Sequence, residues 1–339
     1  VLGQLAKNNP LSDWDSLIVE IAQRMKVPIR LDADISPIML WEELLYEASQ
    51  NGFEYKERWQ ASNPDNSKTI SEIEKCAKQI CAEMLKKNSI EYPIQSRRSR
   101  FLLQVNWGSI ISLNFDEAWL STENEAVFIT NDPSIKVEIL TNENKRMYRH
   151  LVVLNESKRQ IRVWSPNGNI RNANSIRMGL HDFGEQPHAI KQAFSELKAF
   201  ERQTLNAKKN PIDNRIWENY FKSIYNQLHL IPDLSNFFEN NESALPITWV
   251  TEFLYRPLLF VGVGLSDAEI GIWWLLCQRQ RIFARILKKN RPSTRILVKR
   301  GEREAFWQSR PFGVEPIFCD DWDEGWDQID VLYEGKKAW

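Results

Sequence analysis

Apolar residues recur every three or four positions along several stretches of the chain, the spacing that places them on one face of an α-helix. The first stretch follows residues 12–15, whose polar pattern is typical of a capping box at a helix N-terminus. The same spacing returns over about 38–100, over about 184–245 and after Ile270. We therefore predict helices in these four places, with Trp14 buried at the start of the first.

Shorter runs of β-branched and apolar residues separate these stretches and indicate strands. They occupy residues 109–114, 126–130, 137–140, 150–154, 161–164, 257–262, 295–299 and 314–318. Near-continuous apolar strands that alternate with helices are typical of parallel sheets covered on both faces. The predicted fold class is α/β, a Rossmann-like parallel sheet with helices on both faces and a smaller helical layer. Residues 1–339 are expected to form a single domain.

The charge and cysteine content excludes several classes of protein. The chain has 44 Lys and Arg residues against 45 Asp and Glu, a net charge of −1, which argues against nucleic acid as a partner. Its four cysteines form neither a disulfide framework nor a C-x-x-C pair, so we expect no metal and a reducing cytoplasm. No apolar run reaches the roughly 18 residues of a membrane span.

Polar residues and glycines follow several predicted strands, at the edge where parallel α/β sheets bind ligands. The candidate site residues are Gly3, Asn114, Asp116, Asn167, Gly168, Gly262, Gly264, Ser266 and Asp267. A short amide side chain can donate to and accept from ribose hydroxyls. Glycines allow the main chain to approach a phosphate closely. These residue types are therefore suited to binding a nucleotide.

The same residues also have simpler structural interpretations, which stay open. Asn114 and Asp116 form a common turn or helix-cap pattern. Asn167 and Gly168 are a strong two-residue turn signal. The glycines after the strand at 257–262 could make a plain strand-to-helix turn, with Asp267 as the capping residue.

Taken in order, these segments resemble the sirtuin-like family, in the bacterial branch that consumes NAD as an antiphage-defence effector. That branch has a Gly-Ala-Gly-x-Ser turn, a Pro-Ser-Trp helix start, and strands ending in Thr-x-Asn-Tyr-Asp, His-Gly and Gly-x-Ser-Leu-Ser-Asp. The resemblance spans essentially the whole chain. It implies NAD as substrate or ligand and an NAD-glycohydrolase activity, in which water replaces nicotinamide at the ribose C1.

The resemblance also implies a role for each candidate residue. Asn114 matches the catalytic asparagine that handles the nicotinamide ribose and the attacking water, and Asp116 would hold the loop behind it. Four residues match the strand end that lines the adenosine-ribose side: Gly262, Gly264, Ser266 and Asp267. Gly3 matches the first glycine of the Gly-Ala-Gly turn. Asn167 and Gly168 stand at the His-Gly position.

Three departures from the family pattern lead us to expect little or no turnover. Asn167 replaces the catalytic histidine, and a neutral amide cannot accept a proton near pH 7. Leu5 replaces a glycine that lets the main chain approach the pyrophosphate. Gly264 stands where the family has serine. Three explanations stay open: a natural pseudoenzyme, an engineered inactivating change at Asn167, or an incomplete N-terminal strand.

Two other functions remain as alternatives. One is a non-catalytic nucleotide-sensing or scaffolding module of the same fold. The other is a nucleic-acid-contacting subunit that uses the basic cluster Arg97, Arg98 and Arg100. In addition, Trp273 and Trp274 lie on an apolar helix whose large side chains exceed what one face can bury, which predicts a homo-oligomer or a partner protein.

Overall fold

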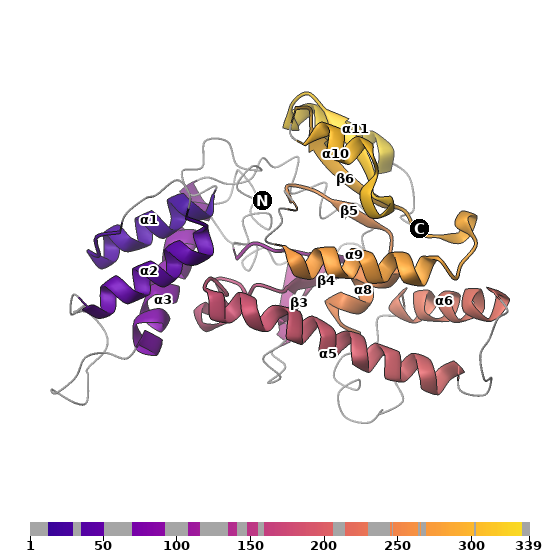
Figure 1. The fold of residues 1–339 in the computed structure, drawn as a ribbon, viewed down its shortest axis with the longest axis horizontal. Coiled ribbons are helices and arrows are strands. Elements are labelled where there is room, and N and C mark those ends of the chain that lie inside the picture. The colour runs from indigo at the N-terminus through magenta and orange to yellow at the C-terminus, as the bar shows by residue number, and fades with distance from the viewer. Residues whose placement is uncertain are drawn as a thin grey trace. The chain divides into compact units, whose positions relative to one another are not determined.

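The computed structural model describes residues 13–29, 35–50, 70–91, 108–115, 135–140, 148–154, 159–205, 214–229, 245, 247–263, 265, 269–301 and 303–333 (Figure 1). The chain divides into two compact units. The first consists of Val1–Leu102, Ser112–His150 and Ser165–Glu185, and the second of Leu103–Ile111, Leu151–Trp164 and Gln186–Trp339. The expectation of one domain over residues 1–339 stays a prediction.

The described helices and strands make a mixed α/β fold with small parallel sheets. The helices are α1 (Trp14–Met25), α2 (Pro37–Gln50), α3 (Ile70–Glu91), α5 (Leu180–Leu205), α6 (Asn214–His229), α8 (Trp249–Tyr255), α9 (Ile270–Phe283), α10 (Glu304–Gln308) and α11 (Trp322–Tyr333). Short 3-10 turns are η4 (Ala173–Ser175), η5 (Lys288–Asn290) and η6 (Pro311–Gly313). The strands are β1 (Ser109–Ile111), β2 (Ile135–Leu140), β3 (Tyr148–Leu154), β4 (Arg159–Ser165), β5 (Leu258–Phe260), β6 (Thr294–Lys299) and β7 (Glu315–Cys319).

The strands form two sheets, in the orders β1-β4-β3-β2 and β5-β6-β7. β1 pairs in parallel with β4, and β6 pairs in parallel with both β5 and β7. The predicted α/β class is therefore confirmed at this level, and seven of the eight predicted strands are present. The eighth, at 126–130, lies outside the described residues.

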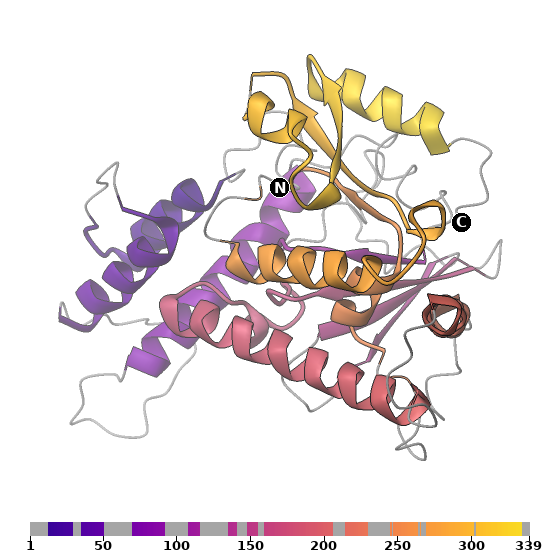
Figure 2. The ribbon, with the colours of Figure 1, turned by 45° about the vertical axis from the view of Figure 1, so that its right-hand side comes forward.

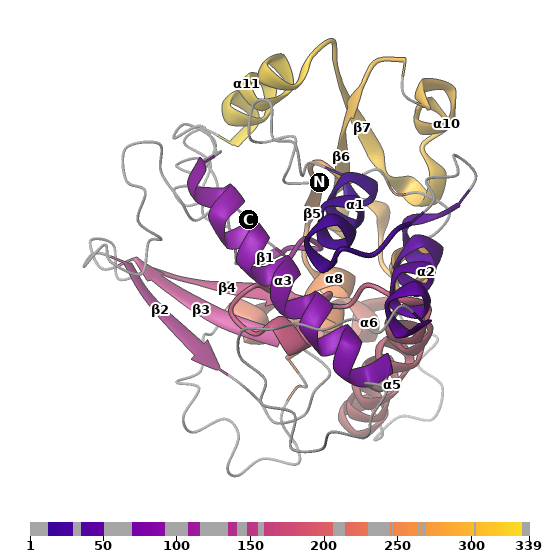
Figure 3. The same ribbon diagram turned by 90° about the vertical axis from the view of Figure 1, so that its left-hand side faces the viewer.

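Helices α1, α2 and α3 of the first unit pack against one another (Figures 2 and 3). Each carries the predicted apolar stripe, and Trp41 of α2 is completely buried among these helices. α1 begins after Asp13, whose Oδ1 accepts a hydrogen bond from the Ser16 main-chain N–H at 2.8 Å. The predicted capping residue Ser12 lies outside the described residues. α1 ends at Lys26, whose left-handed conformation (φ 57°) stops the helix.

Trp14 is half-buried at the start of α1 rather than fully buried as predicted. Its ring centroid lies 5.2 Å from that of Phe115, which follows β1, and 5.6 Å from that of Phe183 in α5. Tilted aromatic pairs at these distances add to the free energy of burial. Trp14 therefore attaches α1 to the segment that follows β1.

The second unit contains the parallel sheet β5-β6-β7 (Figure 2). α9 connects β5 to β6, α10 connects β6 to β7, and α11 follows β7 and packs on β6 and β7. β6 is the central strand, and its Ile296, Leu297 and Val298 are buried. This alternation of parallel strands and helices places all three strand carboxyl ends at one edge of the sheet.

A buried ionic network of the second unit joins β4 to α8 and α6. Arg162 of β4 donates from Nε to Oε1 of Glu252 in α8, and Arg256 Nε lies 2.7 Å from Oε2 of the same carboxylate. Both arginines also donate to the Leu228 carbonyl of α6. Arg162 and Glu252 are each 1% exposed. The network is therefore fully enclosed by the second unit.

The two tryptophans of α9 have neighbours within the second unit. Trp273 packs on Phe306, Trp307 and Phe312, and Trp274 makes an edge contact with Phe194 of α5 at 5.2 Å. These contacts remove much of the apolar excess on which the expectation of a partner was based, although Ile270 stays 66% exposed. None of the helices that the structure describes is long and apolar enough to cross a bilayer.

Replacing Trp14 by alanine tests the attachment of α1. We expect Trp14→Ala to lower the free energy of unfolding by about 2–3 kcal/mol, below the roughly 3–5 kcal/mol of a fully buried tryptophan, because the ring is half-buried. Urea unfolding followed by circular dichroism measures the change. Trp14→Phe, which keeps an aromatic ring, should lose less. A loss below about 1 kcal/mol for the alanine variant would show that α1 does not depend on this contact.

Candidate functional site

One group of candidate residues lies where β1 and β4 end. The two strands are parallel neighbours, with Ser109 opposite Arg162 and Ile111 opposite Trp164. Because parallel neighbours in this register end at the same level, the segments that follow them begin side by side. These segments, residues 112–115 and 165–178, carry the predicted catalytic positions Asn114 and Asn167.

Asn167 joins the two segments through its side chain. Its Nδ2 donates a hydrogen bond of 2.8 Å to the carbonyl of Leu113, the residue before Asn114. Its own carbonyl accepts from the Arg177 N–H at 2.9 Å, and Asn167 is only 6% exposed. The structure thus brings together two positions that are distant in the sequence.

Asn114 lies in a short segment in which hydrogen bonds are made to its own carbonyl and to the carbonyl of the next residue. The Ser112 hydroxyl donates to the Asn114 carbonyl at 3.2 Å, and the next carbonyl, that of Phe115, accepts from the Ile170 N–H at 3.0 Å. Asn114 itself is half-buried. Main-chain and side-chain bonds therefore connect the segment after β1 to the segment after β4 at two points.

A main-chain turn is present here, one residue earlier than the Asn167-Gly168 signal predicted. The Gly168 N–H donates to the Ser165 carbonyl at 2.9 Å, which closes a four-residue turn with Pro166 and Asn167 at its centre. Gly168 has φ 86°, and a Cβ there would lie 2.0 Å from the Ser175 carbonyl oxygen. Only glycine fits this position, because the main chain of η4 approaches so closely.

Hydrogen bonds within the segment after β4 hold it in one conformation. The buried Ser175 hydroxyl accepts from the Asn169 N–H at 3.0 Å and donates to the Asn172 carbonyl at 2.6 Å. The Asn169 Oδ1 accepts from the Arg171 N–H at 3.1 Å. A ligand contacting this segment would therefore meet a preorganised surface rather than one that must order on binding.

An ion cluster fixes the end of the same segment to α3. Lys78 of α3 lies 2.8 Å from both Asp182 and Glu74, and Asp182 also accepts from the Met178 N–H at 3.1 Å. Burial alone would lower the pKa of Lys78, but its hydrogen bonds to the two carboxylates outweigh burial and raise the pKa. Lys78 therefore stays charged near pH 7 and acts as a structural group.

A separate group of candidate residues lies at the carboxyl end of β5, in the second unit. Gly262 turns the chain there with φ 64°, and Leu265 follows in the left-handed region with φ 46°. The Leu265 carbonyl accepts a hydrogen bond of 2.8 Å from Arg303 Nη1, which holds this strained segment from the loop after β6. A left-handed leucine costs energy and persists only where its surroundings determine it.

Glu269 closes the β5 segment and was not a sequence candidate. It precedes α9, and among the residues that the structure describes its buried Oε2 has no hydrogen-bond partner. Burial raises the pKa of this carboxyl group above its usual value of 4.5. The only sequence signal for Glu269 was its place in a polar loop, between the end of a predicted strand and the start of a predicted helix. A buried carboxylate oxygen without a donor is suited to accepting a ligand hydroxyl.

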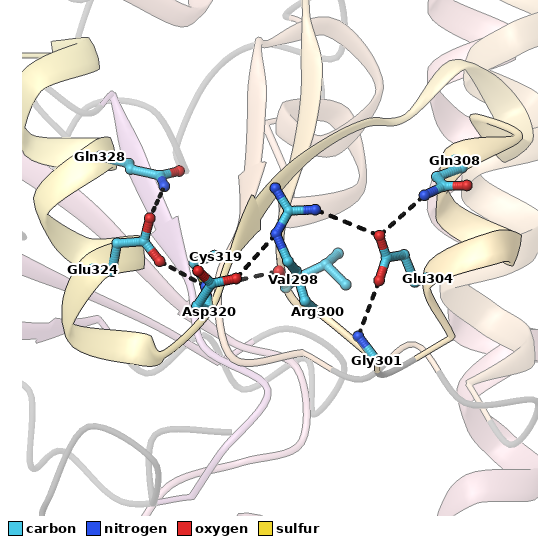
Figure 4. Close-up of polar contacts among 9 residues, drawn as sticks. All are labelled: Val298, Arg300, Gly301, Glu304, Gln308, Cys319, Asp320, Glu324 and Gln328. Carbon is cyan, nitrogen blue, oxygen red and sulfur yellow. Dashed lines mark hydrogen bonds and ion pairs between the residues drawn. The ribbon is translucent and has the colours of Figure 1, made fainter.

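The carboxyl ends of β6 and β7 carry a paired polar cluster (Figure 4). Arg300 Nε lies 3.0 Å from Oδ1 of Asp320 and its Nη1 lies 3.5 Å from Oε1 of Glu304. Glu304 accepts from the Gly301 N–H at 3.2 Å, and Glu324 accepts from the Asp320 N–H at 2.6 Å. These groups satisfy one another on an exposed surface. In the described part of the chain, no group of His, Cys, Asp and Glu side chains is arranged to hold a metal ion.

Several predicted positions fall outside the described residues. They are Gly3, Asp116, Gly264, Ser266 and Asp267, together with Leu5 and the basic cluster Arg97, Arg98 and Arg100. The described candidates are Asn114, Asn167 and Gly168 at the first strand ends and Gly262 at the end of β5. Comparison with known proteins adds no family assignment: no protein-family model, curated protein or solved structure matches the chain.

Proposed function

We propose that the chain is a sirtuin-like NAD-binding protein of the NAD-glycohydrolase type, in which Asn167 impairs hydrolysis. The observation that carries the proposal is the 2.8 Å hydrogen bond from Asn167 Nδ2 to the Leu113 carbonyl. It connects the position of the family histidine to the segment that carries Asn114. We also propose that the small parallel sheets belong to a Rossmann-like arrangement and that the protein acts in the cytoplasm in antiphage defence.

Asn114 would position the nicotinamide ribose and the attacking water, because an amide donates to and accepts from hydroxyl groups. Departure of nicotinamide leaves an electron-poor ribose C1, which the water attacks while a base takes its proton. The amide of Asn167 cannot accept that proton near pH 7. The loss of a general base lowers the rate by about 10²–10⁴. Binding of NAD would therefore persist where its hydrolysis is slow.

The Asn167 hydrogen bond also explains how a histidine could function here. In histidine, Nδ1 is separated from Cβ by the same two bonds as Nδ2 in asparagine. A histidine Nδ1–H could donate to the Leu113 carbonyl, and this bond would fix the tautomer in which Nε2 is the free acceptor. Asparagine keeps the structural hydrogen bond and lacks the base. Asparagine in place of the family histidine would therefore preserve the local structure and remove the group that accepts the proton of the attacking water.

Restoring the base tests this mechanism. We expect Asn167→His to raise nicotinamide release from NAD by about 10²–10⁴, with a rate that increases through a pKa near 6.5 as the imidazole becomes neutral. Nicotinamide is measured by chromatography over a range of pH values. Asn114→Ala in the Asn167→His background should abolish the gain, because the amide that positions ribose and water is removed.

A matched variant and a binding measurement separate the possible outcomes. Asn167→Gln, an amide without a basic nitrogen, should give no gain in release. Calorimetric titration of the unaltered chain should show binding of NAD and ADP-ribose. Binding without any release by Asn167→His would favour a nucleotide sensor of the same fold. Absence of binding by both proteins would favour a scaffold and contradict the proposed function.

Replacing Glu269 tests the β5 strand end. Because burial raises its folded-state pKa, the charged carboxylate destabilises the folded state as pH rises above about 4.5. Glu269→Gln removes this charge, so we expect the thermal midpoint at pH 7 to rise by about 2–4 °C, which corresponds to about 1 kcal/mol. If the carboxylate accepts ribose hydroxyls, the same variant should bind ADP-ribose about tenfold more weakly.

Thermal unfolding and calorimetry measure these two effects on the same samples. Glu196→Gln, which neutralises an exposed carboxylate on α5, serves as the control and should change neither the midpoint nor the affinity. A Glu269→Gln variant that is more stable and binds ADP-ribose with unchanged affinity would remove Glu269 from the ligand site.

A further inference from the structure

The segment from Ile270 to Arg300 contains nine Lys or Arg residues and no Asp or Glu. One of them, Arg279, is completely buried and donates to the Phe253 and Leu254 carbonyls at 2.7 and 2.9 Å, so it is a structural residue. Most of the others are exposed. The net charge of −1 for the whole chain therefore conceals a strong local excess of positive charge.

Five of these residues lie at the carboxyl end of α9 and on the turn that follows it. Figure 1 labels α9. This basic turn consists of Arg281, Arg285, Lys288, Lys289 and Arg291, all of them exposed. The turn leads into β6, so it lies at the amino end of the β5-β6-β7 sheet. The strand-end residues Gly262 and Glu269 lie at the opposite, carboxyl edge.

The positive charge of the basic turn is largely unneutralised. Within the described residues, no carboxylate lies at ion-pair distance from Arg281, Lys288, Lys289 or Arg291. Arg285 lies 3.4 Å from Glu201, but Lys198 lies closer to the same carboxylate, at 2.5 Å. Clustered like charges repel one another and disfavour the compact state, and a polyanion relieves that repulsion.

The turn is also held in a defined conformation. Arg291 donates from Nε to the Ile286 carbonyl at 3.0 Å, and the Leu287 N–H donates to Glu218 of α6 at 3.4 Å. The guanidinium of Arg285 lies 4.4 Å above the ring of Trp217. Contacts within the second unit therefore position two of the cations, Arg285 and Arg291.

We propose that the basic turn binds the phosphate backbone of a nucleic acid. Three of its five cations are guanidinium groups, which bind phosphate in a bidentate manner. A membrane surface is the less suitable partner, because Leu287 is the only large apolar side chain of residues 281–291 that is exposed. The basic turn contains none of the proposed NAD-binding residues, so nucleic-acid binding would be a function separate from NAD binding.

Fluorescence anisotropy of a labelled DNA duplex at increasing salt concentrations tests the proposal. The unaltered chain should bind with a steep salt dependence. The double variant Lys288→Gln/Lys289→Gln should bind more weakly, with the slope of log affinity against log salt reduced by about 2, since each lost phosphate contact removes about 0.9. A labelled single strand of the same length shows which form of nucleic acid is preferred.

The control is Lys86→Gln/Lys87→Gln, which removes the same charge from an exposed lysine pair of α3. It should leave the affinity and the slope unchanged. Equal losses in both double variants, or no salt-dependent binding by the unaltered chain, would overturn the proposal. So would binding only to phosphatidylserine vesicles or to an acidic peptide. Nicotinamide release by Asn167→His should be the same with and without the Lys288/Lys289 changes, so failure of one proposal is distinguishable from failure of the other.

Discussion

Two buried arginines share one buried glutamate in the second unit, and the position of β4 depends on this arrangement. Arg162, Glu252 and Arg256 are enclosed by β4, α8 and the end of α6, and both arginines also donate to one main-chain carbonyl. Burial lowers the pKa of Arg256, and the negative charge of Glu252 opposes this effect only in part. Removing one partner of such a network leaves an uncompensated buried charge, which costs about 3–5 kcal/mol. The network therefore holds β4 in one position relative to the helices around it.

The register between β1 and β4 sets where the two segments with the candidate asparagines begin. With Arg162 opposite Ser109, β1 and β4 end at the same level, and the segments after them begin side by side. Asn167 then reaches the Leu113 carbonyl, and Gly168 allows the main chain to pass close to Ser175. The arrangement supplies a polar surface that hydrogen bonds hold in place, with Asn114 on it. Under the proposed function, NAD binding and hydrolysis would depend on different side chains, because Asn114 would position the ribose and a base at position 167 would accept the proton.

The strands were predictable because their signals are local: the run at 257–262 contains only apolar residues, proline and glycine, and the stretch at 295–299 has three apolar residues between Arg295 and Lys299. The start of α1 was also predictable, since Asp13 and Ser16 lie within one turn of helix. The pairing of Arg162 with Glu252 was not, because no pattern within either segment identifies a partner so far along the chain. Gly168 was a predictable turn residue, but the requirement for glycine comes from the approach of Ser175. The burial of Glu269 likewise depends on tertiary structure. The positive charge of residues 270–300 is visible in the sequence, but the net charge of −1 averages over the whole chain and does not reveal it.

Hydrogen exchange with and without NAD tests most directly the claim that the segments after β1 and β4 form one nucleotide-contacting surface. In the free protein, the main-chain amides of Gly168, Ile170 and Arg177 are hydrogen-bonded, so peptides covering 165–178 should already exchange slowly. Adding NAD should slow exchange further in the peptides that contain 112–115 and 165–178. Peptides that cover the basic turn should be unaffected. Unchanged exchange in both strand-end segments at saturating NAD would contradict the account.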